Sequence, residues 1–406
     1  MQVFFSVGEP SGDLHGANLI DSLQRRHPDW EFVGYGGPKM AAAGCQLHAD
    51  LTQLAVMWVA QVIWNIRQFL LLLARANTYF REQRPDLVVL IDYPGFNWWI
   101  ARKAKALGIP VVYYGTPQLW AWAGWRVRKM RRFVDHVLCK LPFEEAWFRQ
   151  RGCQATFVGH PYFDELHSRA LDAQFVAALE AVEGPLVTIL PGSRTQEVKS
   201  NLEPFLATAL RIQRQVPNTR FAIAAYKPAQ LDLIRALVDQ SGVDAAVHVD
   251  RTAELIAAAR CCLACSGSVS LELLYHTKPS VILYQISRFG YAVQWLFRKV
   301  RYITLVNLLT AEDPFADRSA GIYHPDDPRD QHVLMPEYLT YGDRSADLAA
   351  HVVRWLLDDV QYNENATKLS QLKAQVGQGG ASERAAEYIT NKILPDHVSL
   401  SPSDAA

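Results

Sequence analysis

Residues 186–194 read LVTILPGSR, and this stretch decides the fold. Its first five residues are apolar or β-branched, and Pro191-Gly192 then ends the run before a long helical pattern. A continuous apolar run that is followed by a helix is typical of a strand in a parallel sheet covered on both faces. The stretch therefore predicts an α/β unit that begins near residue 186.

Runs of the same kind recur on both sides of this stretch, with helical patterns between them. They predict strands at 3–7, 32–35, 87–91, 111–114, 136–139 and 156–158 before it, and at 221–225, 246–249, 261–265 and 280–284 after it. We expect two tandem Rossmann-like domains with doubly wound parallel sheets and C-terminal helices. In such folds ligands bind at the carboxyl ends of the strands, so we expect the site in the cleft between the domains.

The domain limits follow from where strand patterns stop. We expect an N-terminal domain at 1–165, because a helical stretch without a strand signal follows it, and a C-terminal domain at 185–342. Within the second domain, the acidic segment 311–331 is predicted to be a surface insertion. Residues 343–394 are predicted to form C-terminal helices that could pack back on the first domain.

Charge is balanced overall but not along the chain. The 406 residues contain 41 Lys plus Arg and 41 Asp plus Glu, which argues against a nucleic-acid partner. Residues 1–160 contain 18 Lys plus Arg and 12 Asp plus Glu, so the remainder contains 23 and 29. The basic first half suits an anionic surface. The N-terminal residues MQVFFSVGEP lack the features of a signal peptide, and we expect a cytoplasmic protein.

A loop at the end of the first predicted strand, GEPSGD at 8–13, occupies the place of a dinucleotide-binding turn but lacks its glycine pattern. The carboxylates of Glu9 and Asp13 would repel a pyrophosphate and suit hydroxyl groups. The alternative is that Ser11 or Asp13 only caps a helix.

Asp92 directly follows the apolar run LVVLI at 87–91. A carboxylate at the carboxyl end of a buried strand lies where a general base is expected. The alternative is that Asp92 caps the next helix.

Two loops of the second half combine Gly and Ser at a strand end. Gly192, Ser193 and Arg194 begin one helix, and residues 266–272, SGSVSLE, begin another. Backbone amides at helix N-termini and an Arg bind phosphate oxygens, and Glu272 could accept hydrogen bonds from a ribose. Together the loops predict a nucleotide-diphosphate site.

Two features predict contact with a membrane surface. Residues 54–74 have the length of a membrane span, but Arg67 near the middle disfavours spanning by about 2.5–3.5 kcal/mol. Seven of the eleven Trp lie between residues 58 and 125, and five Lys or Arg without an acidic residue follow at 126–132. Trp and cations together suit anionic lipid headgroups. The alternatives are a buried helix and a Trp-rich core. The residues predicted to contact lipid are Trp58, Trp64, Trp120, Trp122, Arg126, Arg128 and Arg132.

At this point the chain resembles the lipid-A-disaccharide synthase family over nearly its whole length. The matching blocks, in order, are VGEPSGDLHGANLI, FVGYGGPKMAAAGC, LAVMWVAQVI, IDYPGFN, TPQLWAW, LPFEEAWF, FVGHP, LPGSRTQEV, SGSVSLELL and VNLLT. The resemblance implies a GT-B glycosyltransferase that joins UDP-2,3-diacylglucosamine to 2,3-diacylglucosamine 1-phosphate and releases UDP, at the cytoplasmic face of the inner membrane. It also implies a reaction without metal or other cofactor, and a homodimer that exchanges C-terminal helices.

The resemblance also implies roles for individual residues. Asp92 matches the essential carboxylate of the family and would act with Arg194 in catalysis. The donor-site residues would be Gly192, Ser193, Arg194, Ser266, Gly267, Ser268, Glu272 and Asn307, and those on the acceptor side Glu9, Ser11, Gly12 and Asp13.

Two positions depart from the family pattern. Gly95 stands where some members have a second Asp, and Val306 stands where a Pro commonly precedes the Asn. The first departure leaves open a catalytically silent homologue that binds UDP or glycolipid. A separate alternative is another GT-B enzyme that uses a UDP-sugar, such as an epimerase, but such an enzyme would need its own signatures in place of GEPSGD and IDYPGFN.

Overall fold

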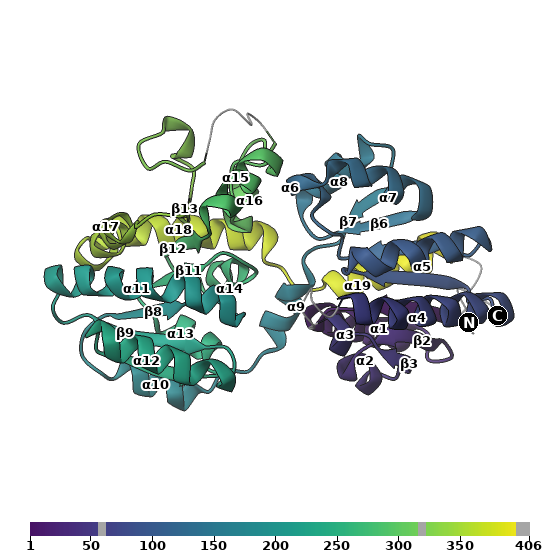
Figure 1. Ribbon diagram of the computed structural model, residues 1–406, viewed down its shortest axis with the longest axis horizontal. Coiled ribbons are helices and arrows are strands. Elements are labelled where there is room, and N and C mark those ends of the chain that lie inside the picture. The colour runs from purple at the N-terminus through teal and green to yellow at the C-terminus, as the bar shows by residue number, and fades with distance from the viewer. Residues whose placement is uncertain (56–61, 316–321, 395–406) are drawn as a thin grey trace, which may run out of the picture. The chain divides into compact units, whose positions relative to one another are not determined.

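The computed structural model describes residues 1–55, 62–315 and 322–394, and for residues 54, 55 and 62–66 only the backbone. The chain forms two compact units. Unit 1 consists of residues 1–165 and 378–406, and unit 2 of residues 166–377. The chain therefore passes from unit 1 to unit 2 and returns (Figure 1).

Unit 1 is built on a parallel sheet of seven strands in the order β3-β2-β1-β4-β5-β6-β7. These strands are β1 (Gln2–Val7), β2 (Glu31–Gly36), β3 (Gln46–Asp50), β4 (Leu87–Ile91), β5 (Val111–Tyr114), β6 (His136–Cys139) and β7 (Ala155–Phe157). The strand order reverses direction between β1 and β4. Their carboxyl ends therefore form a topological switch point, where α/β proteins bind ligands.

Unit 2 repeats this arrangement with six parallel strands in the order β10-β9-β8-β11-β12-β13. The strands are β8 (Leu186–Leu190), β9 (Arg220–Ala225), β10 (Ala245–Val249), β11 (Cys261–Cys265), β12 (Ser280–Gln285) and β13 (Glu337–Thr340). Here the switch point lies between β8 and β11. The predicted α/β class with two parallel sheets is confirmed.

Helices connect the strands in both units (Figure 1). Those of unit 1 are α1 (Pro10–Arg26), α2 (Pro38–Ala42), α3 (Thr52–Ala55), α4 (Val62–Glu82), α5 (Pro94–Ala106), α6 (Leu119–Trp122), α7 (Val127–Phe133), α8 (Pro142–Arg149) and α19 (Ala381–Tyr388). Helix α9 (Pro161–Ser168) contains the passage to unit 2. Those of unit 2 are α10 (Ala173–Glu180), α11 (Thr195–Gln215), α12 (Leu231–Ser241), α13 (Thr252–Ala258), α14 (Val269–Tyr275), α15 (Arg288–Phe297), α16 (Leu305–Thr310), α17 (Ser345–Leu357) and α18 (Asp359–Val376).

Two edge strands, β3 and β13, are not predicted by the sequence. β3 reads QLHAD and is only half-buried, and β13 has four residues and begins with a charged Glu. Neither has the apolar run that identified the central strands. β3 is partly exposed, so its composition gives a weaker signal, whereas β13 is buried but too short and too polar to be recognised as an apolar run.

The C-terminal helices are divided between the units. Helices α17 and α18 belong to unit 2, whereas α19 packs against α1 in unit 1, as the yellow helix among the blue elements of Figure 1. Ala385, Ala386 and Ile389 are fully buried in the core cluster of unit 1. The carboxylate of Asp164 accepts hydrogen bonds from the backbone amides of residues 380–382 at 2.6–3.0 Å and so caps α19. The last described residues are therefore part of the core of unit 1.

We expect Ile389→Ala to lower the free energy of unfolding by about 2–5 kcal/mol, because it removes buried methyl groups and leaves a cavity. Leu357→Ala is the matched control, since Leu357 is 67% exposed and its truncation should change stability by less than about 0.5 kcal/mol. Urea denaturation of both variants tests this. Equal effects of the two substitutions would contradict the assignment of residues 378–394 to the core.

Candidate active site

Asp92 lies in a turn of unusual backbone conformation at the end of β4. Asp92 and Tyr93 both have positive φ, 45° and 40°, a region that costs of order 1–3 kcal/mol for a residue other than Gly. Buried Asn97 holds the turn, because its Nδ2 donates to the carbonyls of Ser6, Ile91 and Asp92 at 3.1, 3.2 and 2.9 Å. Tyr113 also donates its hydroxyl to the carbonyl of Asp92. The neighbouring strands thus fix the position of this carboxylate.

Lys140 is the charged partner of Asp92. Its Nζ lies 3.1 Å from Asp92 Oδ1, and both side chains are largely but not wholly buried. Burial disfavours the ammonium form of Lys140, but the carboxylates of Asp92 and Glu144 outweigh it and raise the pKa of Lys140. The sequence reasoning missed this residue. The available signal was its position, because Lys140 follows β6 as Asp92 follows β4.

Two buried histidines lie near Lys140. Burial, and then the charge of Lys140, lowers the pKa of His15 to about 3 and that of His160 well below its usual value. Both imidazoles are therefore neutral near pH 7 and can serve as hydrogen-bond donors or acceptors. Neither was predicted from the sequence, although both lie in blocks that carry the family resemblance.

The predicted acceptor-side loop lies beside Asp92. A Cβ added to Gly12 would lie 2.9 Å from Val7 Cγ1 and 4.0 Å from Asp92 Oδ2, so only Gly lets α1 approach this closely. Glu9 precedes α1, and both Glu9 and Ser11 are exposed. Gly12 therefore places the start of α1 against the turn that carries the carboxylate.

Asp13 has a different position from the other residues of this loop. Its side chain is buried, and its two oxygens accept hydrogen bonds from the backbone amides of Gly37, Lys39 and Met40 at 2.8–3.2 Å. These amides lie at the start of α2. Asp13 therefore caps the neighbouring helix α2. This role agrees with the alternative that the residue only caps a helix, although the helix is α2 and not its own.

In unit 2, the loop after β8 leads into the N-terminus of α11, which is exposed to solvent. Gly192 has φ 132°, and a Cβ there would lie 2.4 Å from Glu197 Cβ, so the loop requires Gly. Ser193 and Arg194 are exposed, and the Arg194 side chain is 80% accessible. Glu197 pairs with Arg194 at 2.8 Å and accepts from its backbone amide at 3.1 Å. The guanidinium is thus held at the helix start and faces solvent.

The second loop of unit 2 follows β11 and begins α14. Ser266 donates its hydroxyl to the carbonyl of Ile303 at 3.2 Å, whereas Gly267 and Ser268 are exposed. In the part of the chain that the structure describes, no heavy atom beyond its two chain neighbours lies within 4 Å of a Cβ added to Gly267. Glu272 is buried, and its Oε1 accepts from Arg169 at 2.7 Å. Arg169 was not predicted; it orients the carboxylate that the sequence assigns to the ribose.

Asn307 is enclosed in unit 2. Its amide donates to the carbonyl of Met335 at 2.7 Å and to Glu337 at 2.9 Å, and its oxygen accepts from the Met335 amide at 3.1 Å. Both polar atoms of its side chain are therefore engaged with the segment that leads into β13. Asn307 holds this segment and does not present its side chain to solvent.

The residues predicted to contact lipid differ in their exposure to solvent. Trp58 and the side chain of Trp64 lie outside the described residues. Trp120 is only 1% exposed and donates its indole N–H to Glu144 at 2.8 Å, which contradicts lipid contact for this residue. Its ring is part of the core, because a buried carboxylate satisfies its only donor.

Trp122, by contrast, is half exposed and forms a surface cluster with Trp125. Arg126 lies over both rings, 4.9 Å and 5.8 Å from their centroids. Arg128 and Arg132 are exposed on the adjacent α7. This surface therefore combines aromatic rings and cations, as the sequence predicted.

The described part of α4 divides into two faces. Leu72, Ala76 and Phe80 recur at helical spacing and are buried, whereas Leu70 and Leu71 are exposed. Among the described residues, no helix is long and apolar enough to cross a membrane. In the same part of the chain, no group of three or more His, Cys, Asp or Glu side chains could hold a metal ion. The expected metal-independent reaction stays a prediction.

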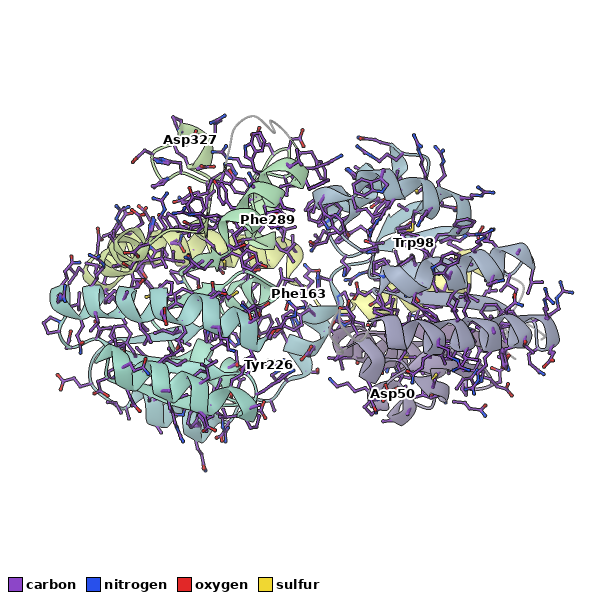
Figure 2. The ribbon with its side chains drawn as sticks, viewed as in Figure 1. Asp50, Trp98, Phe163, Tyr226, Phe289 and Asp327 are labelled. Atoms are coloured by element: carbon purple, nitrogen blue, oxygen red, sulfur yellow. The ribbon has the colours of Figure 1, made fainter. Side chains whose placement is uncertain are left out.

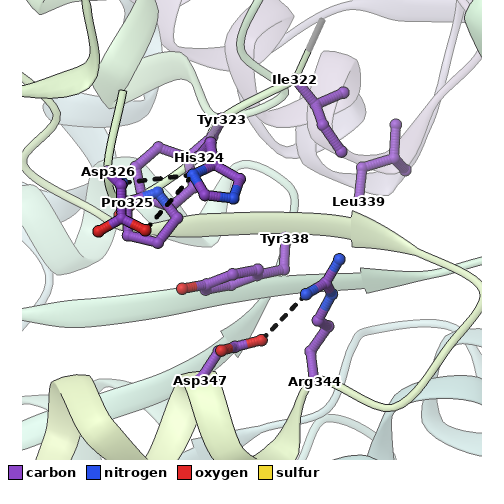
Figure 3. Close-up of a pocket in the computed structure, with 9 residues that line it drawn as sticks. All are labelled: Ile322, Tyr323, His324, Pro325, Asp326, Tyr338, Leu339, Arg344 and Asp347. Carbon is purple, nitrogen blue, oxygen red and sulfur yellow. Dashed lines mark hydrogen bonds and ion pairs between the residues drawn. The ribbon is translucent and has the colours of Figure 1, made fainter. Parts of the chain in front are cut away.

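A cavity of about 320 Å³ in unit 2 lies apart from the predicted residues (Figure 3). Residues 322–326, β13 and the start of α17 line it, and Arg344 pairs with Asp347 on one wall at 3.2 Å. None of its nine lining residues was predicted to bind donor or acceptor. We therefore assign it no part in the site.

Solved structures of low sequence identity share the fold of this chain. UDP-GlcNAc 2-epimerase from Neisseria meningitidis bound to UDP-GlcNAc matches with a TM-score of 0.60 and 13% identity over 97% of this chain and all of that one. The calicheamicin glycosyltransferase CalG4 matches with a TM-score of 0.54 and 15% identity over 97% and 99%. These likenesses define the fold as that of GT-B glycosyltransferases and related epimerases.

Sequence comparison identifies the family within this fold class. The model of the lipid-A-disaccharide synthetase family matches residues 3–318. Lipid-A-disaccharide synthase from Myxococcus xanthus (strain DK1622) is 31% identical over 98% of this chain and 99% of the relative, and that from Coxiella burnetii (strain CbuK_Q154) is 31% identical over 97% and 98%. The chain belongs to the lipid-A-disaccharide synthase family, and is a glycosyltransferase of lipid A biosynthesis.

Glu337 gives a prediction for the pH dependence of stability. Burial outweighs hydrogen bonds from Ile303, Thr304 and Asn307 and raises its pKa from 4.5 to about 7. Because the folded-state pKa is the higher one, the contribution of Glu337 to stability is present below about pH 4.5 and is lost as pH rises through about 7. We expect a loss of up to about 3 kcal/mol in the free energy of unfolding across this window.

Urea denaturation of the wild type and Glu337→Gln between about pH 4 and 8 measures this contribution. The difference between the two pH profiles should change across the window, because Gln does not titrate. Parallel profiles would contradict a raised pKa for Glu337.

Proposed function

We propose that this enzyme transfers 2,3-diacylglucosamine from its UDP derivative to the 6-hydroxyl of 2,3-diacylglucosamine 1-phosphate, forming the lipid A disaccharide 1-phosphate and UDP. The single observation that carries the mechanism is the fixed position of Asp92. A carboxylate at the carboxyl end of a central strand, held by a costly turn and still partly accessible, is placed as a general base. Membership of the lipid-A-disaccharide synthase family supports this choice of substrates.

In the proposed step, Asp92 accepts the proton of the acceptor hydroxyl as its oxygen attacks the anomeric carbon of the donor. The new carbon–oxygen bond forms on the face opposite UDP, the bond to the diphosphate breaks, and the configuration inverts. The Lys140 ammonium, 3.1 Å from Asp92 Oδ1, would hold the carboxylate in position for this step. Gly95 stands where some family members have a second Asp, and in this chain Lys140 supplies a partner of opposite charge.

The donor side of the proposal rests on unit 2. Arg194, Ser193 and the amides after Gly192 would stabilise the charge that develops on the leaving diphosphate. Ser266, Gly267 and Ser268 would contact the nucleotide from the second loop, and Glu272, oriented by Arg169, would accept hydrogen bonds from the ribose hydroxyls. Asn307 would act indirectly by holding the segment before β13.

We further propose that the enzyme is cytoplasmic and associates peripherally with the inner membrane, where acylated substrates reside. The exposed cluster of Trp122, Trp125 and Arg126 supports this, because rings and cations suit anionic headgroups.

A homodimer that exchanges residues 378–394 is the proposed assembly. The Gly-rich link at 377–380 precedes a segment that fills the core of unit 1, and the same contacts could form with a second copy. Such exchange predicts a melting temperature that rises with protein concentration.

We expect Asp92→Asn to lower the rate of disaccharide formation by about 10²–10⁴-fold, because Asn tolerates positive φ but cannot accept the proton. The assay incubates purified protein with both acylated substrates and measures disaccharide and UDP. Asp135→Asn is the matched control, since Asp135 also pairs with a lysine but precedes β6 at the opposite end of the sheet. No product with the wild type would favour the silent homologue, and undiminished product with Asp92→Asn would refute the general base.

We expect Arg194→Ala to lower kcat by about 10²–10³-fold through lost stabilisation of the leaving diphosphate. Arg344→Ala is a close control in the same unit, because Arg344 also precedes a helix and pairs with an acid three residues on. Steady-state kinetics and the inhibition constant of UDP test both variants. Equal kinetics for the two would remove Arg194 from the donor site.

A further inference from the structure

Helix α15 of unit 2 exposes apolar side chains to an unusual degree. Phe289 is 79% and Trp295 74% exposed, and Leu296 and Phe297 are also exposed. Figure 2 marks Phe289 on this helix. Residues 292–297 are all exposed, so the exposure is not confined to one stripe. Large aromatic side chains are normally covered, and a cluster of them in solvent indicates an interaction surface.

The distribution of exposure indicates what covers this surface. A single protein helix packed on α15 would cover one stripe and leave the other sides in water. A helix at a lipid interface buries its apolar side chains about 5–10 Å into the boundary between headgroups and acyl chains, and it needs no partner of complementary shape. The helix has ten residues, about half the length that crosses a hydrocarbon core, so it can enter the interface but not span it.

The charges around α15 match an anionic surface. Arg288 begins the helix and is exposed, and Arg298 and Lys299 follow it and are partly exposed. No Asp or Glu occurs from residue 286 to residue 311. Arg301 also lies in this segment, but it is not one of the cations available to a lipid surface, because it is buried and paired with Asp327 and Asp330. Aromatic side chains between cations fit anionic lipid headgroups above an acyl layer.

We propose that α15 is a second membrane-contact element, by which unit 2 inserts Phe289, Trp295, Leu296 and Phe297 into the interface of an anionic phospholipid bilayer. The inference deepens the proposed function, since it rests on peripheral association with a membrane, but the earlier contact surface belongs to unit 1. Each unit thereby has its own lipid contact.

The experiment is co-sedimentation of the full chain with vesicles of phosphatidylcholine, with and without phosphatidylglycerol. The double variant Phe289→Ser and Trp295→Ser should lower the partition coefficient on anionic vesicles by about tenfold or more, because two rings no longer leave water. The matched control replaces Leu357 and Val360 with Ser, since both are about two-thirds exposed elsewhere in unit 2. It should bind as the wild type does.

A fluorescent label reports on α15 itself. All six native cysteines are buried, so Trp295→Cys provides an accessible thiol for a polarity-sensitive fluorophore, with Leu357→Cys as the control. We expect a blue shift on anionic vesicles for the first label only. If the serine variant binds vesicles as the wild type does and the label at residue 295 shows no blue shift, the α15 proposal is overturned. The proposed lipid contact of unit 1 would be unaffected by that result.

The remaining outcomes separate this proposal from its alternatives. A blue shift without vesicles that grows with protein concentration would mean that a second copy of the chain covers α15, and would overturn the proposal. Failure of the wild type to bind vesicles would reject peripheral association as a whole. Disaccharide formation in detergent solution should be retained by the serine variant, so loss of membrane contact is distinguishable from loss of the proposed activity.

Discussion

Both units depend on one constraint: their central parallel strands are buried on both faces. A strand in this position has no solvated face, so its residues must be apolar, and the polar side chains that function requires appear just after it. Asp92 follows β4, Lys140 follows β6, and Arg194 follows β8 within a few residues. The chemistry of the molecule is therefore collected at the carboxyl edges of two sheets. The helices that follow these strands then present their N-terminal amides to the same edges.

Two of three buried asparagines fasten these edges, and the third holds the segment that leads into β13. Asn97 joins the ends of β1 and β4. Asn201 donates to the carbonyl of Pro191 and to Cys265, and accepts from the amide of Gln285, so it joins the ends of β8, β11 and β12. Asn307 holds the segment before β13. The carboxamide group suits this task because it donates and accepts without carrying a charge into the core. Backbone carbonyls and amides at the strand ends thus form hydrogen bonds with these side chains and need no water as a partner.

The sequence predicted the central strands, the two-domain class and the residues at the switch points, because buried runs and Gly-containing turns are local signals. Residues that act across long separations were not predictable in this way. Lys140 meets Asp92 from 48 positions away, and Arg169 meets Glu272 from 103. Trp120 was wrongly predicted to contact lipid, although its sequence neighbours Trp122 and Trp125 are exposed. Only its hydrogen bond to the buried carboxylate of Glu144 distinguishes Trp120 from these two residues. Similarly, the spacing of GEPSGD does not reveal that Asp13 caps α2. Burial and partner depend on tertiary contacts that a single sequence does not show.

The return of the chain to unit 1 has a consequence for biosynthesis. The core of unit 1 includes Ile389, whereas its first strand begins at residue 2, so every residue between them must leave the ribosome before this core is complete. Unit 2 ends at residue 377 and needs no later residue for its own sheet. The nascent chain therefore departs from the usual order in which the N-terminal domain is finished first. Until residues 378–394 have been synthesised, the apolar face of α1 that receives α19 stays uncovered.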